Sequence, residues 1–373
     1  MTEPVAPSTD HVVARLSVID RFLPVWILAA MAAGIGLGRA VPGLGGWLDR
    51  LQVTSGTPLP IFVGLLVMMY PVLARVRYGH LGAVTRDHRM LVSSLVLNWL
   101  VGPAVMFTLA WVFLADLPAE RTGLIIVGLA RCIAMVLIWN DLACGDREAA
   151  AVLVALNSLF QIAAFALLGA FYLDVLPGWL GLSTVGIHVS VGTIAATVAI
   201  FLGVPLVAGF LTRTIGERVR GRQWYETRLL PRLGPFALYG LLFTIVVLFA
   251  LQGRTITQRP GDVARVALPL LAYFAVMWTG GFALGRAIGL PYERTATLAF
   301  TAAGNNFELA IAVAIGVFGV TSGEALAGVV GPLIEVPALV GLVYVALWAR
   351  HRYPAPAGRT TEPAPGGLEE VVR

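Results

Sequence analysis

The chain contains ten apolar stretches of close to 20 residues each, and this pattern restricts its fold more than any other feature. A helix of about 20 apolar residues crosses a lipid bilayer. Lipid provides no hydrogen-bond partners, so a spanning segment must be a helix or part of a closed barrel. The stretches are continuous and too long for barrel strands, which favours an all-α integral membrane protein. We expect spans at 23–41, 57–74, 90–114, 122–143, 149–173, 188–211, 233–251, 264–285, 295–319 and 325–349.

The composition agrees with a lipid environment. Of the 373 residues, 58% are hydrophobic and only 13% are charged, whereas a soluble domain carries about 25% charged residues. The net charge of +5 could indicate a nucleic-acid partner. We expect none, because the arginines lie in short loops between apolar stretches, where they determine membrane topology.

The distribution of arginines predicts the orientation. Placing both termini in the cytoplasm puts 19 of the 26 arginines on the inner side and six on the outer side, in agreement with the positive-inside rule. We therefore expect a multi-pass protein of the plasma membrane. The polar tails, 1–20 and 351–373, would both be cytoplasmic, and the proline-rich C-terminal tail is expected to be disordered.

A basic loop at 212–232 divides the predicted transporter domain, 21–350, into halves at 21–211 and 212–350. These two parts hold six and four of the expected spans. Two repeats of five spans each, 23–173 and 188–349, would enter the membrane in opposite directions, because five is odd. Inverted repeats are common in secondary transporters, which hold their substrate near the bilayer midplane. We therefore expect two inverted five-helix repeats.

Polar residues inside the spans are the best candidates for function, because they are costly in lipid. Gly304 and its two following asparagines favour turns over helix. We expect the ninth span to be broken there, and its counterpart in the first half, the fourth span, to be broken as well, since a broken helix exposes peptide groups that can line a cavity. The candidate substrate-binding residues are Arg131, Cys132, Asn305, Asn306, Glu308 and Glu335.

The buried charges suggest ion pairing and proton coupling. Arg131 stays protonated and needs a partner. Either Glu308 or Glu335 could provide a carboxylate, and the sequence alone does not decide between them. We favour Glu335 as the partner of Arg131, with Glu308 as the group that takes up and releases a coupling proton. Protons and the lipid bilayer are therefore expected partners, and the pattern contains no signal for the number of subunits.

Cys132 adds soft chemistry to the fourth span. Thiolates prefer soft metals and metalloids, so trivalent arsenic is a suitable ligand for this thiol. The alternative interpretation is that Cys132 is simply a small buried hydrophobic residue. Cys144 lies 12 residues further on, about 18 Å along a helix and too far for a disulfide. It is either incidental or part of a thiol relay. Asn157 and Gln161 lie one turn apart, and we interpret them as packing contacts between helices.

Four runs resemble the signatures of one family, the Acr-type arsenite efflux permeases of the bile acid/arsenite/riboflavin transporter superfamily. They are DRFLPVW at 20–26, GLARCIAMV at 128–136, NNFELAIA at 305–312 and GPLIEVP at 331–337. The resemblance implies ten spans, export of arsenite driven by the proton-motive force, and functional roles for Cys132 and Glu308. It implies this driving force rather than ATP, and the chain lacks the glycine-rich Gly-Lys loop that binds ATP phosphates. We expect no cofactor.

Two other functions remain as alternatives. A sodium-coupled organic-anion carrier of the same superfamily would not need Cys132. An intramembrane enzyme would need a Ser–His pair, paired buried aspartates or a His-Glu-x-x-His zinc motif. The five histidines lie in tails, loops or a span end, so this class is disfavoured. Antimonite shares the thiol affinity of arsenite and stays open as a second substrate.

Overall fold

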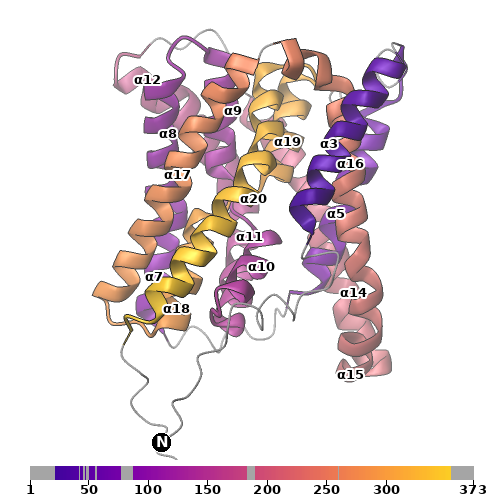
Figure 1. The fold of residues 1–373 in the computed structure, drawn as a ribbon. Coiled ribbons are helices and arrows are strands. Elements are labelled where there is room, and N and C mark those ends of the chain that lie inside the picture. Colours follow the sequence, from indigo (N-terminus) through magenta and orange to yellow (C-terminus); the bar gives the residue numbers. More distant parts are fainter. Residues whose placement is uncertain are drawn as a thin grey trace, which may run out of the picture.

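The computed structural model describes residues 22–353, apart from 42, 45–46, 48–49, 55–56, 77–86, 183–189 and 259. Within these residues the protein is predominantly helical, and most of its helices run roughly alongside one another (Figure 1). The predicted N-terminal tail and residues 354–373 of the predicted C-terminal tail lie outside the described residues.

The first half of the chain begins with a helix and a short ribbon. The elements are α3 (Leu23–Ala40), β1 (Gln52–Thr54), β2 (Thr57–Pro58), α5 (Leu59–Ala74), α7 (His88–Val96), η2 (Leu97–Val101), α8 (Gly102–Phe113), α9 (Pro118–Leu129), α10 (Met135–Leu142), α11 (Arg147–Ala170), η3 (Phe171–Val175) and α12 (Leu176–Trp179). The antiparallel β1–β2 ribbon was not predicted. It takes the first two residues of the span expected at 57–74, because Pro58 is extended and α5 starts after it.

The described residues from 190 onward form helices joined by short non-helical segments. The elements are α13 (Val191–Val198), η4 (Ala199–Gly203), α14 (Val204–Arg220), α15 (Arg222–Trp224), η5 (Tyr225–Leu229), α16 (Leu230–Gln258), α17 (Pro260–Ala287), α18 (Tyr292–Ala303), α19 (Phe307–Phe318) and α20 (Gly323–Arg350). The elements η2 to η5 are single π-helical turns inside longer helices.

Among the described residues, six helical segments are long and apolar enough to cross a membrane, and α3, α5 and α19 are shorter apolar helices. The outward faces are apolar as well: Leu100, Val112 and Leu167 are 64%, 69% and 66% exposed. Because exposed leucine and valine are stable in lipid but not as large patches in water, these faces identify a multi-pass membrane protein.

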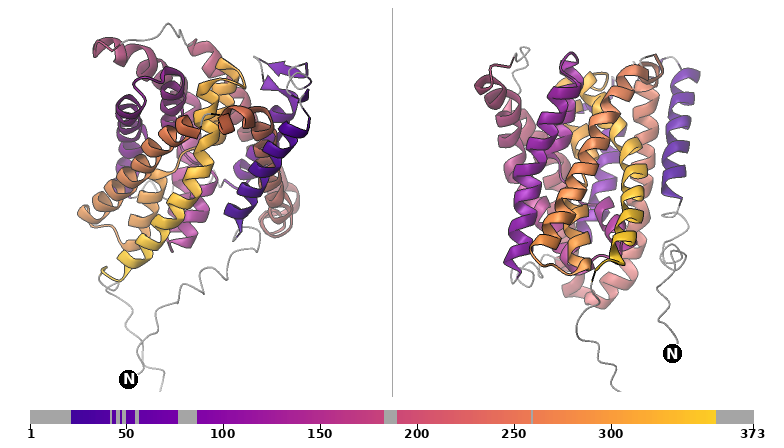
Figure 2. Two further views of the ribbon diagram at one scale, coloured as in Figure 1. Left: turned by 45° about the horizontal axis from the view of Figure 1, so that its top comes forward. Right: turned by 60° about the vertical axis from the view of Figure 1, so that its left-hand side comes forward.

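The helices form two packed groups. Helices α3, α5, α14 and α16, here called the scaffold helices, contact one another on one side of the molecule. Helices α8, α9, α10, α11, α17, α18, α19 and α20, here called the crossing helices, pack together on the other (Figures 1 and 2). Helix α13 packs against α11 and α19 and continues into α14, so it connects the two groups.

Close backbone approach holds α3 against α16. A side chain at Gly34 would begin 2.6 Å from the carbonyl oxygen of Val246, and one at Gly38 would collide with the carbonyl oxygen of Ala250. Small residues allow this contact, which is how membrane helices gain packing energy without a hydrophobic effect.

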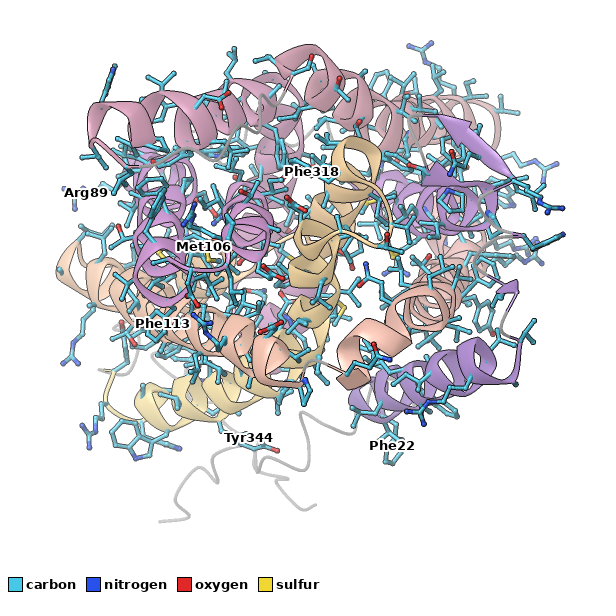
Figure 3. The ribbon with its side chains drawn as sticks, turned by 90° about the horizontal axis from the view of Figure 1, so that it is seen from above. Phe22, Arg89, Met106, Phe113, Phe318 and Tyr344 are labelled. Carbon is cyan, nitrogen blue, oxygen red and sulfur yellow. The ribbon has the colours of Figure 1, made fainter. Side chains whose placement is uncertain are left out.

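The crossing helices surround a filled interior. Seen from above, Met106 lies among them, whereas Phe22, Arg89 and Tyr344 lie around the periphery (Figure 3). Met106 is fully buried and its side chain occupies the space that a side chain at Gly128 of α9 would need. The two interrupted helices, α9–α10 and α18–α19, belong to this group.

Candidate functional site

The two interruptions meet and bond to each other. Helix α9 gives way to extended backbone at Ala130, and α18 does so at Gly304. The extended segments run antiparallel: the Asn306 amide donates to the Ala130 carbonyl at 3.0 Å, and the Cys132 amide donates to the Gly304 carbonyl at 3.2 Å. We call residues 130–134 and 304–306 the crossing. Each segment thus satisfies peptide groups that the other exposes, as backbone at membrane depth requires.

Local sequence explains why the helices restart after the crossing. The side chain of Asn306 accepts from the Leu309 amide at 3.0 Å and caps the start of α19. The sulfur of Cys132 plays the corresponding part for α10, accepting from the Val136 amide at 3.3 Å. Asn305 donates to the Val127 carbonyl at 2.8 Å, at the end of α9. Polar residues in both spans therefore replace the helical hydrogen bonds that the breaks remove.

Gly304 determines how closely the two segments approach. A side chain there would place its first carbon 2.9 Å from the Cys132 β-carbon and 3.6 Å from the sulfur. Such a separation is shorter than the ordinary contact of carbon atoms, about 3.5–4.0 Å. Only glycine leaves the thiol its present position against α18.

The thiol and two carboxyls lie together at the crossing. Cys132 is 5% exposed and Glu335, on α20, is 4% exposed, whereas Glu308, in the first turn of α19, is partly exposed. The two carboxyls are near enough to each other, and to the sulfur, for electrostatic interaction. Helices α10 and α19 also begin at the crossing, and the N-terminal end of a helix favours a nearby negative charge. This arrangement brings a soft sulfur, two carboxyls and two helix N-termini to one place.

The prediction of an ion pair between Arg131 and Glu335 is wrong. Among the described residues, no carboxylate lies within ion-pair distance of the Arg131 side chain; it donates instead to the Tyr273 hydroxyl, at 2.7 Å, and to the Gly128 carbonyl. The physical reason is the C-terminal end of α9, whose free carbonyls attract a cation. Gly102 of α8 provides the space, since a side chain there would begin 2.8 Å from the Arg131 guanidinium.

Several buried polar atoms at the crossing have no hydrogen-bond partner within the described part of the chain. They are Nε of Arg131, Nε2 of Gln161, Oδ1 of Asn305, Nδ2 of Asn306 and Oε1 of Glu335. Unsatisfied buried groups of this kind are rare in folded proteins and call for an explanation such as a ligand. Donors and acceptors are both represented, so a small hydroxylated molecule could satisfy them.

Sequence reasoning missed Tyr273 and underestimated Gln161. Tyr273 lies in an apolar stretch, and only its hydroxyl indicated that it would need a partner inside the membrane. Gln161 was interpreted as a packing residue, yet its side-chain oxygen accepts from the Arg131 backbone amide. Asn157 does fit the packing interpretation, because it accepts from the Trp99 indole at 3.2 Å.

Cys144 does not belong to the crossing. It lies after the C-terminal end of α10 in a left-handed conformation, with φ of 57°. No cluster of three or more histidine, cysteine, aspartate or glutamate residues suited to a metal ion occurs among the residues that the structure describes. A soft metal or metalloid at the crossing could therefore bind one thiol, and carboxyl and amide groups would surround it.

Comparison with known proteins identifies the family. The profile of the sodium bile acid symporter family matches residues 62–259. An arsenical-resistance protein Acr3 from Corynebacterium glutamicum is 57% identical over 335 residues, which cover 90% of each chain. The chain belongs to the Acr3 family. An uncharacterized transporter from Synechocystis sp. is 31% identical over the full length of both chains. The Acr3 protein from Alkaliphilus metalliredigens is 29% identical over 90% of this chain and 94% of its own.

Membership of the Acr3 family confirms the resemblance predicted from four sequence runs. It also makes the chain a transporter rather than an enzyme, within the wider sodium bile acid symporter family. In this Acr3 family member, the profile match contains the first interruption, at Arg131 and Cys132, and ends before the second, at Gly304.

Proposed function

We propose that this chain exports arsenite from the cell across the plasma membrane in exchange for protons, using Cys132 and Glu308 at the crossing. Its relatives named arsenical-resistance protein Acr3 support the substrate, since arsenite is the common dissolved form of trivalent arsenic. The same site would accept antimonite, because both metalloids bind thiols.

The observation that carries the proposal is the position of the Cys132 sulfur. It is buried at the meeting point of two interrupted helices, against Gly304, with two carboxyls near it. A cysteine that only filled space could lie in an unbroken helix. Cys132 lies instead within the interruption between α9 and α10 and faces the interruption between α18 and α19. The position suits a soft ligand that enters between interrupted helices, as substrates do in other secondary transporters.

The chemistry at sulfur would be a ligand exchange. Arsenite near neutral pH is an uncharged trihydroxide. As the Cys132 sulfur bonds to arsenic, one arsenic–oxygen bond breaks, and the departing hydroxide leaves as water with the thiol proton. The reverse reaction, with one water consumed, restores arsenite and the thiol. Because one thiol makes only one bond to arsenic, the complex dissociates easily enough for transport.

Glu308 would couple this exchange to protons. Membrane potential alone does not drive an uncharged solute, so another driving ion is needed. In the inward-facing state, an ionised Glu308 would accept hydrogen bonds from the arsenic hydroxyls. In the outward-facing state, it would take up a proton, lose those bonds and release the substrate. Glu308 suits this role better than Glu335, because it is partly exposed whereas Glu335 is almost completely buried.

The proposed architecture is ten spans in two inverted five-helix repeats, with both termini in the cytoplasm. The interruptions support it, since they fall in the fourth and ninth spans, the fourth of each proposed five-span repeat, and cross near their centres. Antiparallel pairing of equivalent segments is what a pseudo-two-fold axis in the membrane plane would produce.

The test is uptake of arsenite into everted membrane vesicles with an imposed proton gradient. The wild type should accumulate arsenite only when the vesicle interior is acidic. Cys132→Ser and Glu308→Gln should both abolish accumulation. Cys144→Ser is the matched control, because it removes the other thiol of the chain and lies outside the crossing; it should transport like the wild type.

Two results would contradict the proposal. Uptake that ignores the proton gradient would exclude proton exchange, and uptake retained in Cys132→Ser would exclude the thiol. Antibody detection of each variant in the vesicles separates lost transport from lost protein.

The second candidate is a sodium-coupled organic-anion carrier, favoured by the name of the matching family. It predicts uptake of an organic acid, such as a bile acid, that depends on a sodium gradient. Replacing sodium by choline in the same vesicles distinguishes the two candidates. Cys132→Ser would leave sodium-driven uptake of an organic acid unchanged.

A further inference from the structure

Gln161 of α11 has one satisfied and one free hydrogen-bonding group. Its side chain is completely buried, and its Oε1 accepts from the backbone amide of Arg131, at the start of the crossing. Only the oxygen of an amide can accept from N–H, so this bond fixes the orientation of the side chain. Nε2 must therefore be the free end, and it has no partner among the described residues.

A buried amide donor without a partner is costly, by about 1–3 kcal/mol. A neighbouring polar residue on α11 has no such free donor: the fully buried Ser158 hydroxyl donates to the Val154 carbonyl of its own helix. The free Nε2 of Gln161 belongs to an amide group whose oxygen is bonded to Arg131, the residue before Cys132.

We propose that Gln161 recognises the oxygen of the substrate, donating from Nε2 to a hydroxyl oxygen of thiol-bound arsenite. This inference rests on the proposed function and adds a specificity determinant to it. Cys132 would bind arsenic through sulfur, and the remaining hydroxyl groups would need donors and acceptors. Gln161 supplies a donor that is held rigidly by the backbone of the residue next to the thiol.

The consequence is selectivity for hydroxylated arsenic. After one hydroxyl is exchanged for sulfur, arsenite keeps two hydroxyls, whereas methylarsenite keeps one and a methyl group. A site with a fixed donor disfavours the methyl group, because the donor would then stay unpaired in a dry environment. The wild type should therefore bind arsenite better than methylarsenite.

The test compares arsenite and methylarsenite in everted vesicles that contain wild type, Gln161→Met or Gln161→Glu. The Met variant keeps the volume but removes both polar groups, and the Glu variant keeps an acceptor for the Arg131 amide. For each we would measure KM and Vmax for arsenite and the inhibition constant of methylarsenite. Ser158→Ala, also buried on α11, is the matched control and should behave like the wild type.

Loss of one such hydrogen bond should raise KM for arsenite about 10-fold, with Vmax largely kept and the inhibition constant of methylarsenite little changed. Should the Met variant not reach the membrane, Gln161→Leu, which also lacks a donor, answers the question, because a buried glutamic acid can keep a proton and donate it. An unchanged KM for arsenite, or an equal loss for both arsenicals, overturns the inference. Proton dependence and the requirement for Cys132 in the wild type would still stand in either case, so the two proposals fail separately.

Discussion

Glycine serves two different purposes in the α3–α16 contact and at the crossing. In α3, Gly38 lets the backbone approach Ala250 of α16, and this approach holds the two scaffold helices together. At the crossing, Gly304 lets the backbone approach Cys132, whose sulfur is part of the proposed site. The first contact stabilises the fold, and the second positions the thiol of the proposed site, whose neighbours include unsatisfied polar atoms. A substitution of Gly38 should therefore be tested by the stability of the protein, and a substitution of Gly304 by its transport rate.

The largest expected effect is that of Gly304→Ala on transport. The new methyl group would lie 2.9 Å from the Cys132 β-carbon and would displace the sulfur. A shift of about 1 Å in a reacting group can reduce a rate about 100-fold. The backbone at Gly304, with φ of −71°, suits alanine, so the protein should still fold. Initial rates of arsenite uptake per folded molecule would show the loss.

Gly280→Ala is the matched control for this prediction. Gly280 lies on α17, and a side chain there would meet no atom within 4 Å. The control should transport like the wild type. Equal rates in Gly304→Ala and Gly280→Ala would mean that the crossing tolerates displacement of the thiol, and the contrast between the two regions would be lost.

The next effect concerns stability and comes from Gly38→Ala. The added methyl group would collide with the Ala250 carbonyl oxygen and force α3 away from α16. Overpacking of this kind costs about 1–3 kcal/mol. The melting temperature in detergent should fall, whereas the transport rate of the folded molecules should stay the same. Gly36→Ala is the control, since no atom lies near its added side chain, and its melting temperature should not fall.

A smaller loss of transport is expected for Tyr273→Phe. The Tyr273 hydroxyl accepts from the Arg131 guanidinium at 2.7 Å, and the aromatic ring would remain in place. Hydrogen bonds to charged groups contribute about 1.5–3 kcal/mol, but the guanidinium keeps its bond to the Gly128 carbonyl. We expect about a 10-fold fall in rate at the lower end of that range. Tyr344→Phe, in an outward-facing tyrosine that is 58% exposed, should have no effect on transport.

Much of the fold could be predicted from the sequence, because apolar length is a direct signal for membrane helices. The position of the second interruption was also predictable, since Gly304 is followed by two residues that favour turns over helix. The β1–β2 ribbon was not, because five residues of strand leave little pattern. Packing of α3 on α16 depends on which glycines face each other, and that is a property of the folded chain.

The candidate site was only partly predictable. Residue types in the fourth and ninth spans indicated Cys132 and Glu308 as partners, and the structure brings their spans together. The partner of Arg131 could not be found by counting charges, because a helix end and a tyrosine hydroxyl can satisfy a guanidinium as well as a carboxylate can. The free amide of Gln161 likewise depends on a tertiary hydrogen bond that no sequence spacing encodes.

The smallest expected effect lies outside both regions, in the ion pair between Asp116 and Arg265. Asp116, in the loop after α8, accepts from the Arg265 guanidinium at 2.8 Å, but its side chain is 67% exposed, so solvent screens the pair. The hydrogen bond from Arg265 lowers the pKa of Asp116 from 3.8 to about 2. The stabilising contribution is therefore complete above the ordinary value and is lost as the pH falls through about 2.

Asp116→Asn should accordingly lower the melting temperature slightly at neutral pH, and the difference from the wild type should shrink only below about pH 4. Melting temperatures in detergent from pH 7 to the lowest pH that the protein tolerates would measure this. Transport should be unchanged, because the pair lies in neither the α3–α16 contact nor the crossing. A difference that disappears already at pH 5 would mean that the carboxyl titrates higher than the ion pair allows. A loss of transport would mean that the loop after α8 acts on the crossing, and the division between stabilising and functional contacts would have to be redrawn to include it.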